Sequence, residues 1–290
     1  MGILYVVGTP IGNLEDMTFR AVRVLREVDL IAAEDTRTAR VLLSHFDIHT
    51  PVTSYFEHNK LTKLDRILSA LMEGDVALIS EAGMPGLSDP GYELIRAALA
   101  AGHQVVPIPG PVAAVTALVI SGLPTDRFLF LGFLPRRQAQ RRRLLRSVAT
   151  EPGTLVAYEA PHRLVSALRD IAEVLGDRPV AVAEELTKRY ESVFRGRVTE
   201  AIAHFEAERP RGEYTLVIGG APREAAEQAW PIERVEAALT ILLNEGVSRA
   251  TAARALSKLT GRPRREIYRL ALNIASPSPE ETSSQMEEER

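Results

Sequence analysis

Residues 3–33 read ILYVVGTPIGNLEDMTFRAVRVLREVDLIAA, and their pattern indicates the fold class. Two short apolar runs, Ile3–Val7 and Leu30–Ala33, predict strands. The segment between them, Thr18–Val28, carries small or apolar residues at a helical spacing, namely Phe19, Val22 and Leu25. Because strand, helix and strand follow one another, the stretch predicts a βαβ unit, which requires a parallel sheet with helices packed on its faces.

The same alternation continues along the chain. In the first half, further strand candidates are Asp75–Ile79 and Gln104–Ile108, each after a helical stretch. A second round follows, with strand candidates at Phe128–Gly132, Thr154–Tyr158, Val180–Ala183 and Tyr214–Ile218. The turn residues at 121–124 separate the two rounds, so we predict two α/β domains, at residues 1–122 and 123–228.

Two further parts follow the second round. Helical stretches joined by glycine turns predict a small helical unit at residues 229–274. In its second helix, from Arg249, we expect an apolar stripe made of Ala252, Ala255, Leu256 and Leu259. Residues 275–290 are polar, acidic and rich in proline and serine, which is typical of a disordered tail.

Composition excludes several kinds of protein. None of the 290 residues is cysteine, which excludes disulfides, thiolate metal sites and cysteine nucleophiles and agrees with a cytoplasmic location. No segment offers about eighteen consecutive apolar residues, and the N-terminal stretch reads as a strand, so we expect neither a membrane partner nor a signal peptide. The net charge of −3 comes from the tail, so basic character, if it matters, must be local.

Three loops after predicted strands are rich in glycine and proline: residues 8–13 (GTPIGN), 80–91 (SEAGMPGLSDPG) and 107–111 (PIPGP). Ligands of open α/β sheets bind beyond the carboxyl ends of the strands, where such loops gather. Glycine lets the backbone approach a ligand, although each loop alone also reads as a tight connection. None of them matches G-x-G-x-x-G or a P-loop, and their prolines remove amide donors, which disfavours nucleoside triphosphates.

Long motifs carry a resemblance to a known family. They are residues 5–37 (YVVGTPIGNLEDMTFRAVRVLREVDLIAAEDTR), SEAGMPGLSDPG, residues 107–124 (PIPGPVAAVTALVISGLP), residues 132–135 (GFLP), YEAPHR at 158–163, EELTKRYE at 184–191 and GEYTLVI at 212–218. They resemble the tetrapyrrole methylase superfamily over about residues 3–275. Within it they are similar to the bacterial branch that methylates the ribose 2′-oxygen of a cytidine in small-subunit (16S) ribosomal RNA.

The resemblance implies S-adenosylmethionine bound in a cleft between two α/β domains, and a homodimer that acts on ribosomal RNA or on the assembled small subunit. Carried over to this sequence, the cofactor residues are Pro10, Ile11, Gly12, Ser80, Gly83, Met84, Pro85, Leu87, Gly110, Pro111, Tyr158, Ala183 and Tyr214. The superfamily usually has aspartate where this chain has Asn13 and Met84. That departure implies a cofactor held mainly by backbone groups and apolar contact, and it weakens the case for a tetrapyrrole substrate.

Methyl transfer to a hydroxyl requires alignment of two reactants and a group that removes the proton or stabilises the alkoxide. We predict catalytic roles for Lys188, Glu184 and Asp35. Each has an alternative: Asp35 with Arg37 also reads as a helix cap, and Lys188 also reads as a solvated lysine. Glu184 and Lys188 would share a face on a helix, but the pattern also permits a strand end. Further polar candidates are Glu81, Asp89 and Glu159, and the sequence does not name the base.

Two local basic patches predict RNA contact. The first lies on the helix after Pro135 and includes Arg136, Arg137, Arg141 and Arg142, with no acidic residue among them. The second lies in the helical unit and includes Arg249, Arg254, Lys258, Arg264 and Arg265. RNA affinity is largely electrostatic, and arginine binds phosphate in a bidentate fashion. The alternatives are a solvated helix face and a cap that stabilises the second domain.

Other readings of the sequence remain open. His45 and His49 have a spacing found in metal sites, but no third ligand is indicated, so we expect no metal. One rival function keeps the cofactor and methylates carbon on a tetrapyrrole. Another is a ribosome-assembly protein that binds RNA and has no chemistry.

Overall fold

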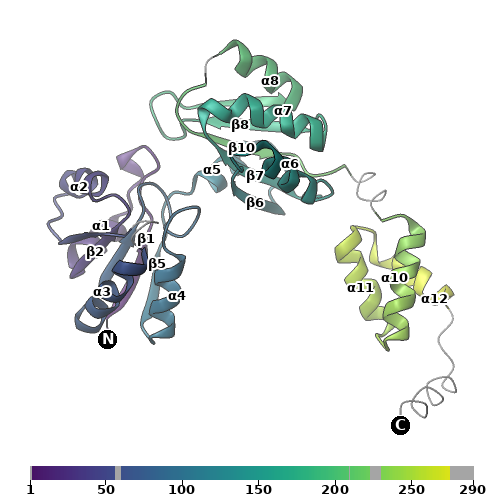
Figure 1. The fold of residues 1–290 in the computed structure, drawn as a ribbon, viewed down its shortest axis with the longest axis horizontal. Coiled ribbons are helices and arrows are strands. Elements are labelled where there is room, and N and C mark those ends of the chain that lie inside the picture. Colours follow the sequence, from purple (N-terminus) through teal and green to yellow (C-terminus); the bar gives the residue numbers. More distant parts are fainter. Residues whose placement is uncertain (1, 56–59, 209, 223–229, 275–290) are drawn as a thin grey trace, which may run out of the picture. The chain divides into compact units, whose positions relative to one another are not determined.

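The computed structural model describes residues 2–55, 60–208, 210–222 and 230–274. Its contacts divide the chain into two compact units, Met1–Arg143 with Thr154–Gly219, and Leu144–Gly153 with Gly220–Arg290. Both sheets lie in the first unit (Figure 1). The predicted domain boundaries after residues 122 and 228 divide the chain differently, and they stay predictions.

The first sheet has five parallel strands in the order β3-β2-β4-β1-β5, as the βαβ pattern predicts. They are β1 (Ile3–Val7), β2 (Leu30–Ala33), β3 (Val52–Ser54), β4 (Val76–Ile79) and β5 (Gln104–Ile108). Two hydrophobic clusters cover its faces, one with helices α1 and α2 and one with α3 and α4. These helices are α1 (Phe19–Glu27), α2 (Thr36–His45), α3 (Lys60–Glu73) and α4 (Tyr92–Ala100).

Helix α1 shows where periodicity misleads. Thr18 caps it, because the threonine side chain accepts a hydrogen bond from the Ala21 backbone N–H. The buried side chains are Ala21, Val24 and Leu25, and Phe19 is 98% exposed. The helical spacing of Phe19, Val22 and Leu25 is therefore confirmed as a helix, but the buried face of this helix begins at Ala21 and does not include Phe19.

The second sheet is mixed, with the order β6-β7-β10-β8-β9. Its strands are β6 (Phe128–Phe133), β7 (Thr154–Glu159), β8 (Pro179–Glu184), β9 (Ser192–Arg197) and β10 (Tyr214–Ile218). Only β6 and β7 pair in parallel among the described strands of this sheet. The short 3-10 helix η2 (Pro161–Arg163) and the helices α6 (Gln138–Ser147), α7 (Leu164–Leu175) and α8 (Val198–Ala207) connect these strands. Strand β9 pairs with β8 and was not among the predicted strands.

Helix α5 (Ala113–Ile120) packs on the second sheet although it follows the last strand of the first. Its buried residues Ala114, Ala117 and Leu118 share a cluster with Val156 of β7 and Val217 of β10. The predicted first domain includes this helix, but its packing places it with the second sheet.

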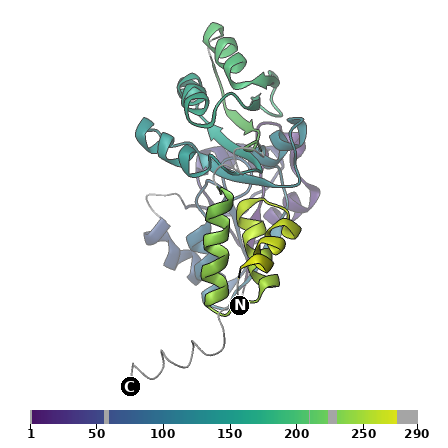
Figure 2. The same cartoon turned by 90° about the vertical axis from the view of Figure 1, so that its right-hand side faces the viewer.

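Between residues 230 and 274, the second unit contains the helices α10 (Ile232–Asn244), α11 (Arg249–Thr260) and α12 (Arg264–Asn273). Figure 2 shows them in yellow-green and yellow, packed against one another around their own hydrophobic cluster. The predicted stripe on α11 was half right. Ala252 and Leu256 are buried, whereas Ala255 is exposed and Leu259 is 67% exposed, with Ala253 buried instead. Over the described residues, every helix is too short or too polar to span a membrane.

Candidate functional site

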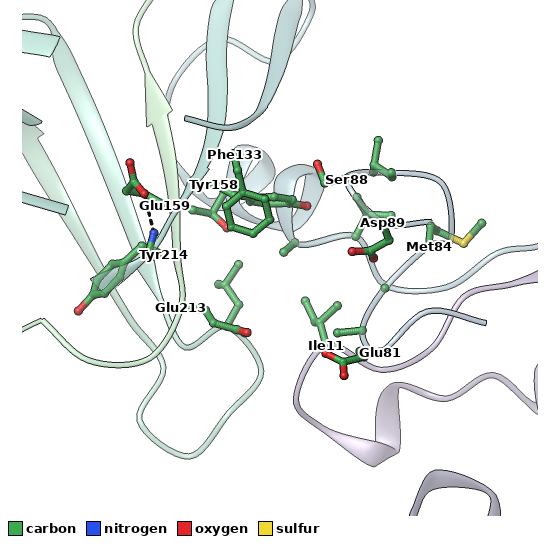
Figure 3. A pocket seen from close by; sticks show the side chains of 18 of the residues that line it. Ile11, Glu81, Met84, Ser88, Asp89, Phe133, Tyr158, Glu159, Glu213 and Tyr214 are labelled. Atoms are coloured by element: carbon green, nitrogen blue, oxygen red, sulfur yellow. Dashed lines mark hydrogen bonds between the residues drawn. The ribbon is translucent and has the colours of Figure 1, made fainter. Parts of the chain in front are cut away.

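A cavity of about 370 Å³ lies within the first unit. Residues of the loops after β1, β4 and β5 form one side of it, and residues of β6, β7, β10 and the segments beside them form the other (Figure 3). We call this the first cavity. Its lining includes the apolar residues Ile11, Met84, Leu87, Val112 and Leu186 and the aromatic residues Phe133 and Tyr158. The loops at the carboxyl ends of the parallel strands therefore do gather at one site, as predicted.

Backbone contacts fix these loops to one another. Thr9 and Gly83 exchange backbone hydrogen bonds of 2.9 and 3.1 Å, which join the first loop to the second. Gly8 and Gly110 join the first loop to the third, since a Cβ added to Gly8 would lie only 2.7 Å from the Gly110 Cα atom. Only glycine permits such an approach. The rim of the first sheet is thus a rigid wall built largely from main chain.

The first cavity is acidic. Five carboxylates line it, those of Glu34, Glu81, Asp89, Glu159 and Glu213. Its described lining contains no lysine, arginine or histidine. Burial, reinforced by the nearby charge of Glu34, raises the pKa of Asp89 to about 7, and burial also raises the pKa of Glu34. This charge distribution favours a cationic ligand.

An aromatic wall faces these carboxylates. The rings of Tyr158 and Phe133 lie 5.3 Å apart, and Figure 3 shows them opposite the Asp89 carboxylate. The Tyr158 hydroxyl accepts a hydrogen bond of 3.1 Å from the Ala114 backbone N–H. Burial raises the pKa of this phenol, so Tyr158 stays neutral at physiological pH. The wall offers a flat apolar surface of the kind on which a planar ring stacks.

A second cavity, of about 700 Å³, adjoins the first. The two share lining residues Ile11, Glu81, Ala82 and Glu213. Unlike the first, the second cavity is lined by cations, Arg37 and Lys188. Two chemically different spaces therefore meet at Ile11 and Glu81, one acidic and largely apolar, the other partly basic.

Lys188 is held in place on two sides. Its Nζ atom donates to Glu185 at 2.9 Å and to Glu213 at 3.1 Å. Burial alone would lower its pKa, but these two carboxylates raise it, so the ammonium keeps its proton at neutral pH. Its side chain packs on Gly12, whose φ is +149°, and a Cβ added there would lie 2.5 Å from the Lys188 Cγ atom.

The predicted cofactor residues divide between the two cavities. Ile11, Gly83, Met84, Leu87, Tyr158 and Tyr214 line the first, and Pro10, Ile11, Gly12 and Ser80 line the second. Pro85, Gly110, Pro111 and Ala183 line neither; Gly110 instead lets two loops touch, and Ala183 is part of the core. The Tyr214 ring points away from the first cavity in Figure 3, and its hydroxyl donates to Glu184 at 2.6 Å.

The three predicted catalytic residues differ in position. Lys188 and Asp35 line the second cavity, whereas Glu184 lines neither cavity. Glu184 ends strand β8 and accepts hydrogen bonds from Tyr214 and Ser192, which is a structural role, so the geometry does not support a catalytic one. The strand-end reading of Glu184 is confirmed, and the shared helix face with Lys188 is not.

The cap reading of Asp35 is also confirmed. Its carboxylate accepts a hydrogen bond of 2.7 Å from the Arg37 backbone N–H at the start of α2 and pairs with the Arg37 guanidinium. These contacts lower the pKa of Asp35 to about 2, which makes it a weak base. His49 pairs with Asp47 at 2.9 Å, and no group of three candidate metal ligands occurs in the described part of the chain.

Part of the first basic patch is structural. Arg141 is 3% exposed and pairs with Asp170 of α7 at 2.5 Å, and Arg142 pairs with Asp170 and Glu173. The prediction that Arg141 contacts RNA was therefore wrong. Both ion pairs of Arg142 are with residues of α7. The acidic partners come from another helix, which the spacing along α6 could not reveal. Arg136 and Arg137 are exposed and make no ion pair with the described residues.

The second basic patch is largely free. Arg254, Lys258, Arg264 and Arg265 are exposed and pair with no acidic residue of the described chain. Arg249 differs, because its guanidinium donates to the backbone carbonyls of Ala271 and Ile274 and so ties α11 to the end of α12.

Sequence reasoning missed Glu34 and Phe133 of the first cavity and gave Asp89 no definite role. Asp89 lies in the quoted loop at 80–91, so its position was visible and its environment was not. Glu34 directly follows strand β2, and only the order β2-β4-β1 brings it beside the loop after β4. Phe133 closes the aromatic wall from strand β6.

Comparison with solved structures supports the fold. The methyltransferase CobJ superposes with a TM-score of 0.55 at 20% identity, over 76% of this chain and 95% of that one. Diphthine synthase gives a TM-score of 0.56 at 14% identity, over 76% of this chain and 90% of its own. At these identities the likeness shows the fold alone, which contains two sheets covered by helices.

Comparison with known sequences identifies the family. Residues 3–202 match the family described as Tetrapyrrole (Corrin/Porphyrin) Methylases. The ribosomal RNA small subunit methyltransferase I of Synechocystis sp. is 48% identical over 94% of this chain and 99% of its own length. The proteins of that name from Thermotoga maritima and Bacillus subtilis are 51% and 43% identical, over 76% and 92% of this chain and 99% and 93% of their own. The chain therefore belongs to the tetrapyrrole methylase family, in the group that contains these methyltransferases.

Proposed function

We propose that this chain is an S-adenosylmethionine-dependent methyltransferase that acts on the ribose 2′-hydroxyl of a cytidine in small-subunit (16S) ribosomal RNA. Relatives that match over nearly the whole chain are named ribosomal RNA small subunit methyltransferase I. The observation that carries the proposal is that an acidic first cavity, whose described lining has no cation, adjoins a second cavity that contains Arg37 and Lys188.

The first cavity fits the donor. S-adenosylmethionine carries a sulfonium and an ammonium, and we expect the carboxylates of Glu34 and Glu81 to face these charges. The wall formed by Tyr158 and Phe133 suits a planar adenine. Bound there, the donor supplies an electrophilic methyl group, and the chain's part is to hold it, exclude water and align the acceptor.

The same charge distribution disfavours a nucleoside triphosphate as the ligand. Its phosphates would bring anions into a cavity lined by five carboxylates and, in its described lining, no cation. A tetrapyrrole methyltransferase would hold the same donor in this cavity, so the labelling test below separates that rival. An RNA-binding protein without chemistry needs no such cavity, so calorimetry with the donor separates it from an enzyme.

The second cavity suits the acceptor strand. Its cations attract phosphate, and Lys188 keeps its charge at neutral pH. Because Lys188 lies in the cavity that adjoins the donor site, its ammonium either stabilises the forming alkoxide or holds a phosphate beside it. Arg37 adds a second cation, since its side chain is largely exposed although it pairs with Asp35.

The RNA contact surface is proposed from free cations. In the second unit these are Arg254, Lys258, Arg264 and Arg265, and in the first unit Arg136 and Arg137. Unpaired cations release counterions from RNA on binding, which gives affinity that depends strongly on salt. Ribosomal RNA or the assembled small subunit is then the partner, and the cytoplasm is the location.

A homodimer is proposed from exposed apolar side chains in the first unit. Helix α5 is apolar on all sides, and its residues Val115 and Val119 are 45% and 69% exposed. The edge strand β6 likewise exposes Phe128 and Leu129. A second copy of the chain would cover such surface. Light scattering should give twice the chain mass for the wild type and one chain mass for Val119→Glu; equal masses would refute this interface.

The decisive test of the activity is direct. Purified protein is incubated with methyl-labelled S-adenosylmethionine and small ribosomal subunits that lack the modification, and the label is then located. We expect label on one cytidine of the RNA, with the adjacent phosphodiester resistant to alkali because the 2′-oxygen is blocked. Label on a base, on a tetrapyrrole or on nothing would refute the proposal.

A further inference from the structure

We propose that Asp89 is the catalytic base, whose carboxylate takes the proton of the acceptor hydroxyl at the first cavity. This inference rests on the proposed function, because a base is needed only if the acceptor is a hydroxyl group. It assigns the one catalytic role that the sequence leaves open.

The position of Asp89 suits this role. It lies in the loop after β4, lines the first cavity and is partly buried, and Figure 3 shows its carboxylate directed into the space below the Phe133 and Tyr158 rings. The preceding residue, Ser88, has a φ of +68°. Non-glycine residues adopt that conformation at a cost that surrounding contacts must offset, and such residues gather at functional sites. The loop therefore holds Asp89 at the wall of the cavity.

The groups that face Asp89 poise it for proton transfer. The carboxylates of Glu34, at the end of β2, and Glu81, in the same loop, raise its pKa, and the Ser80 side chain lowers it by hydrogen bonding. The Tyr158 phenol faces it from β7. Since burial is the largest cause and the result is about 7, half of the Asp89 carboxyls are ionised near neutral pH, where a general base is most effective.

Three other carboxylates of the cavities are less suited to this role. Glu159 is 1% exposed, and its Oε1 atom is bound to Arg163 at 2.6 Å and to the Ala160 backbone N–H at 2.8 Å. Glu213 pairs with Lys188. The pKa of Asp35, at about 2, makes it too weak a base.

Two non-carboxylate candidates also fail. Lys188 keeps its proton at neutral pH because Glu185 and Glu213 raise its pKa. The Tyr158 phenol has a raised pKa as well and stays protonated. Neither group can accept a proton in its prevailing form.

The step balances. The oxygen of the acceptor hydroxyl forms a bond to the methyl carbon as the bond from that carbon to sulfur breaks, and the bonding pair stays on sulfur as a neutral thioether. The hydroxyl proton passes to Asp89, which becomes a neutral carboxylic acid. A positive charge on the donor and a negative charge on Asp89 disappear together, which a partly buried cavity favours over separated ions.

Single-turnover methylation of small subunits, measured from pH 5.5 to 9, tests the assignment. The wild-type rate should rise with pH and level off, with an apparent pKa near 7. Asp89→Asn should lower the plateau by about 100-fold or more, within the range for loss of a general base. Calorimetry with S-adenosylhomocysteine should give a dissociation constant for Asp89→Asn within about threefold of wild type, since the variant keeps the cavity's shape.

Two further variants separate chemistry from structure. Glu34→Gln removes a charge that raises the pKa of Asp89, so the pH range in which the single-turnover rate rises should move to lower pH. Asp65→Asn, which changes an exposed carboxylate on α3, serves as the matched control and should leave the rate and its dependence on pH unchanged.

The outcomes distinguish the two proposals. Asp89 is not the base if Asp89→Asn reacts within fivefold of the wild-type rate at pH 8, or if its rate rises with pH over the same range as the wild-type rate. In that case the methyltransferase proposal is unaffected, provided that the wild type methylates the RNA. If the wild type itself transfers no methyl group to RNA although it binds S-adenosylhomocysteine, the proposed function fails. If the rate of Glu34→Gln rises over the same pH range as the wild-type rate, this would also contradict the assignment of Asp89 as the base.

Discussion

At the scale of single residues, the raised pKa of Asp89 has a consequence for stability. The folded protein binds a proton at this carboxyl up to about pH 7, whereas the unfolded chain releases it near the ordinary pKa of aspartate. Between these values the native state holds more protons, so the contribution of Asp89 to stability falls as pH rises and is most unfavourable above pH 7. Function and stability are opposed at this position.

Asp89→Asn should therefore be more stable than wild type at pH 8, and the gain should shrink toward pH 5. Since 1 kcal/mol moves the melting temperature of a chain of this size by about 2–4 °C, we expect a gain of roughly 2 °C or more at pH 8. Calorimetric melting at both pH values measures it. A loss of stability at pH 8, or an equal gain at pH 5, would mean that Asp89 is not desolvated.

Lys188→Ala tests the cation of the second cavity. If Lys188 stabilises the alkoxide, the single-turnover rate should fall about 100-fold, the scale of one lost stabilising donor. If it holds a phosphate, RNA affinity should fall and the salt slope should decrease by about one. Lys188→Arg, which keeps the charge, should retain more of either property, and an unchanged rate together with unchanged affinity in Lys188→Ala would remove Lys188 from the site.

Residue roles were predictable from sequence where they depend on neighbours along the chain. The Asp35 cap was one such case, because its partner Arg37 lies two residues away. Asp89 was not, because its burial and its neighbour Glu34 arise from the order of strands in the sheet. Arg141 shows the converse error: a cation that looked free in the sequence is paired with Asp170, 29 residues away.

At the scale of elements, Asp170 joins α7 to α6. It is 1% exposed and accepts hydrogen bonds from Gln138, Arg141 and Arg142. Burial alone would raise its pKa, but these three donors lower it, so it stays ionised. Two helices are thus held by one buried, multiply bonded carboxylate.

Asp170→Ala should cost about 3–5 kcal/mol in free energy of unfolding, because it leaves the buried Arg141 guanidinium without its partner. Urea unfolding measures the change. Asp65→Ala, at an exposed site, should cost no more than about 0.5 kcal/mol. A cost below about 1 kcal/mol for Asp170→Ala would show that Arg141 finds water or another partner.

Elements were predictable where apolar runs were short and bounded. Strands β1, β2, β4 and β5 coincide with such runs, because the strands of parallel sheets are typically rich in apolar residues. Strand β9, with sequence SVFRGR, was missed because its exposed face carries arginine and its pattern matches no buried strand. The packing of α5 on the second sheet was also beyond the sequence, because a helix that is apolar on all sides does not reveal which sheet it covers.

At the scale of the whole molecule, a net charge of −3 conceals two separate charge patterns. The first cavity gathers carboxylates, and the second unit exposes cations such as Arg264 and Arg265. Composition predicted only that basic character must be local. Where the acidic residues converge depends on the loops of the first sheet and was not readable from the chain.

The charge-reversed variant Arg264→Glu/Arg265→Glu should weaken binding to small-subunit RNA and reduce the slope of log affinity against log salt by about two. The double variant Arg66→Glu/Arg96→Glu, at exposed residues of α3 and α4 in the first unit, changes the net charge by the same amount and should have little effect. Filter binding at several salt concentrations measures both. An equal loss in the two variants would show that only total charge matters, not this surface.

We propose that the acidic first cavity holds the methyl donor. A crystal structure of the protein grown with S-adenosylmethionine tests it most directly. We expect the donor in the first cavity, with its adenine against Tyr158 and Phe133 and its methyl group on the side of Asp89. A donor bound elsewhere, or a first cavity without it at saturating concentration, would show that the first cavity is not the donor site.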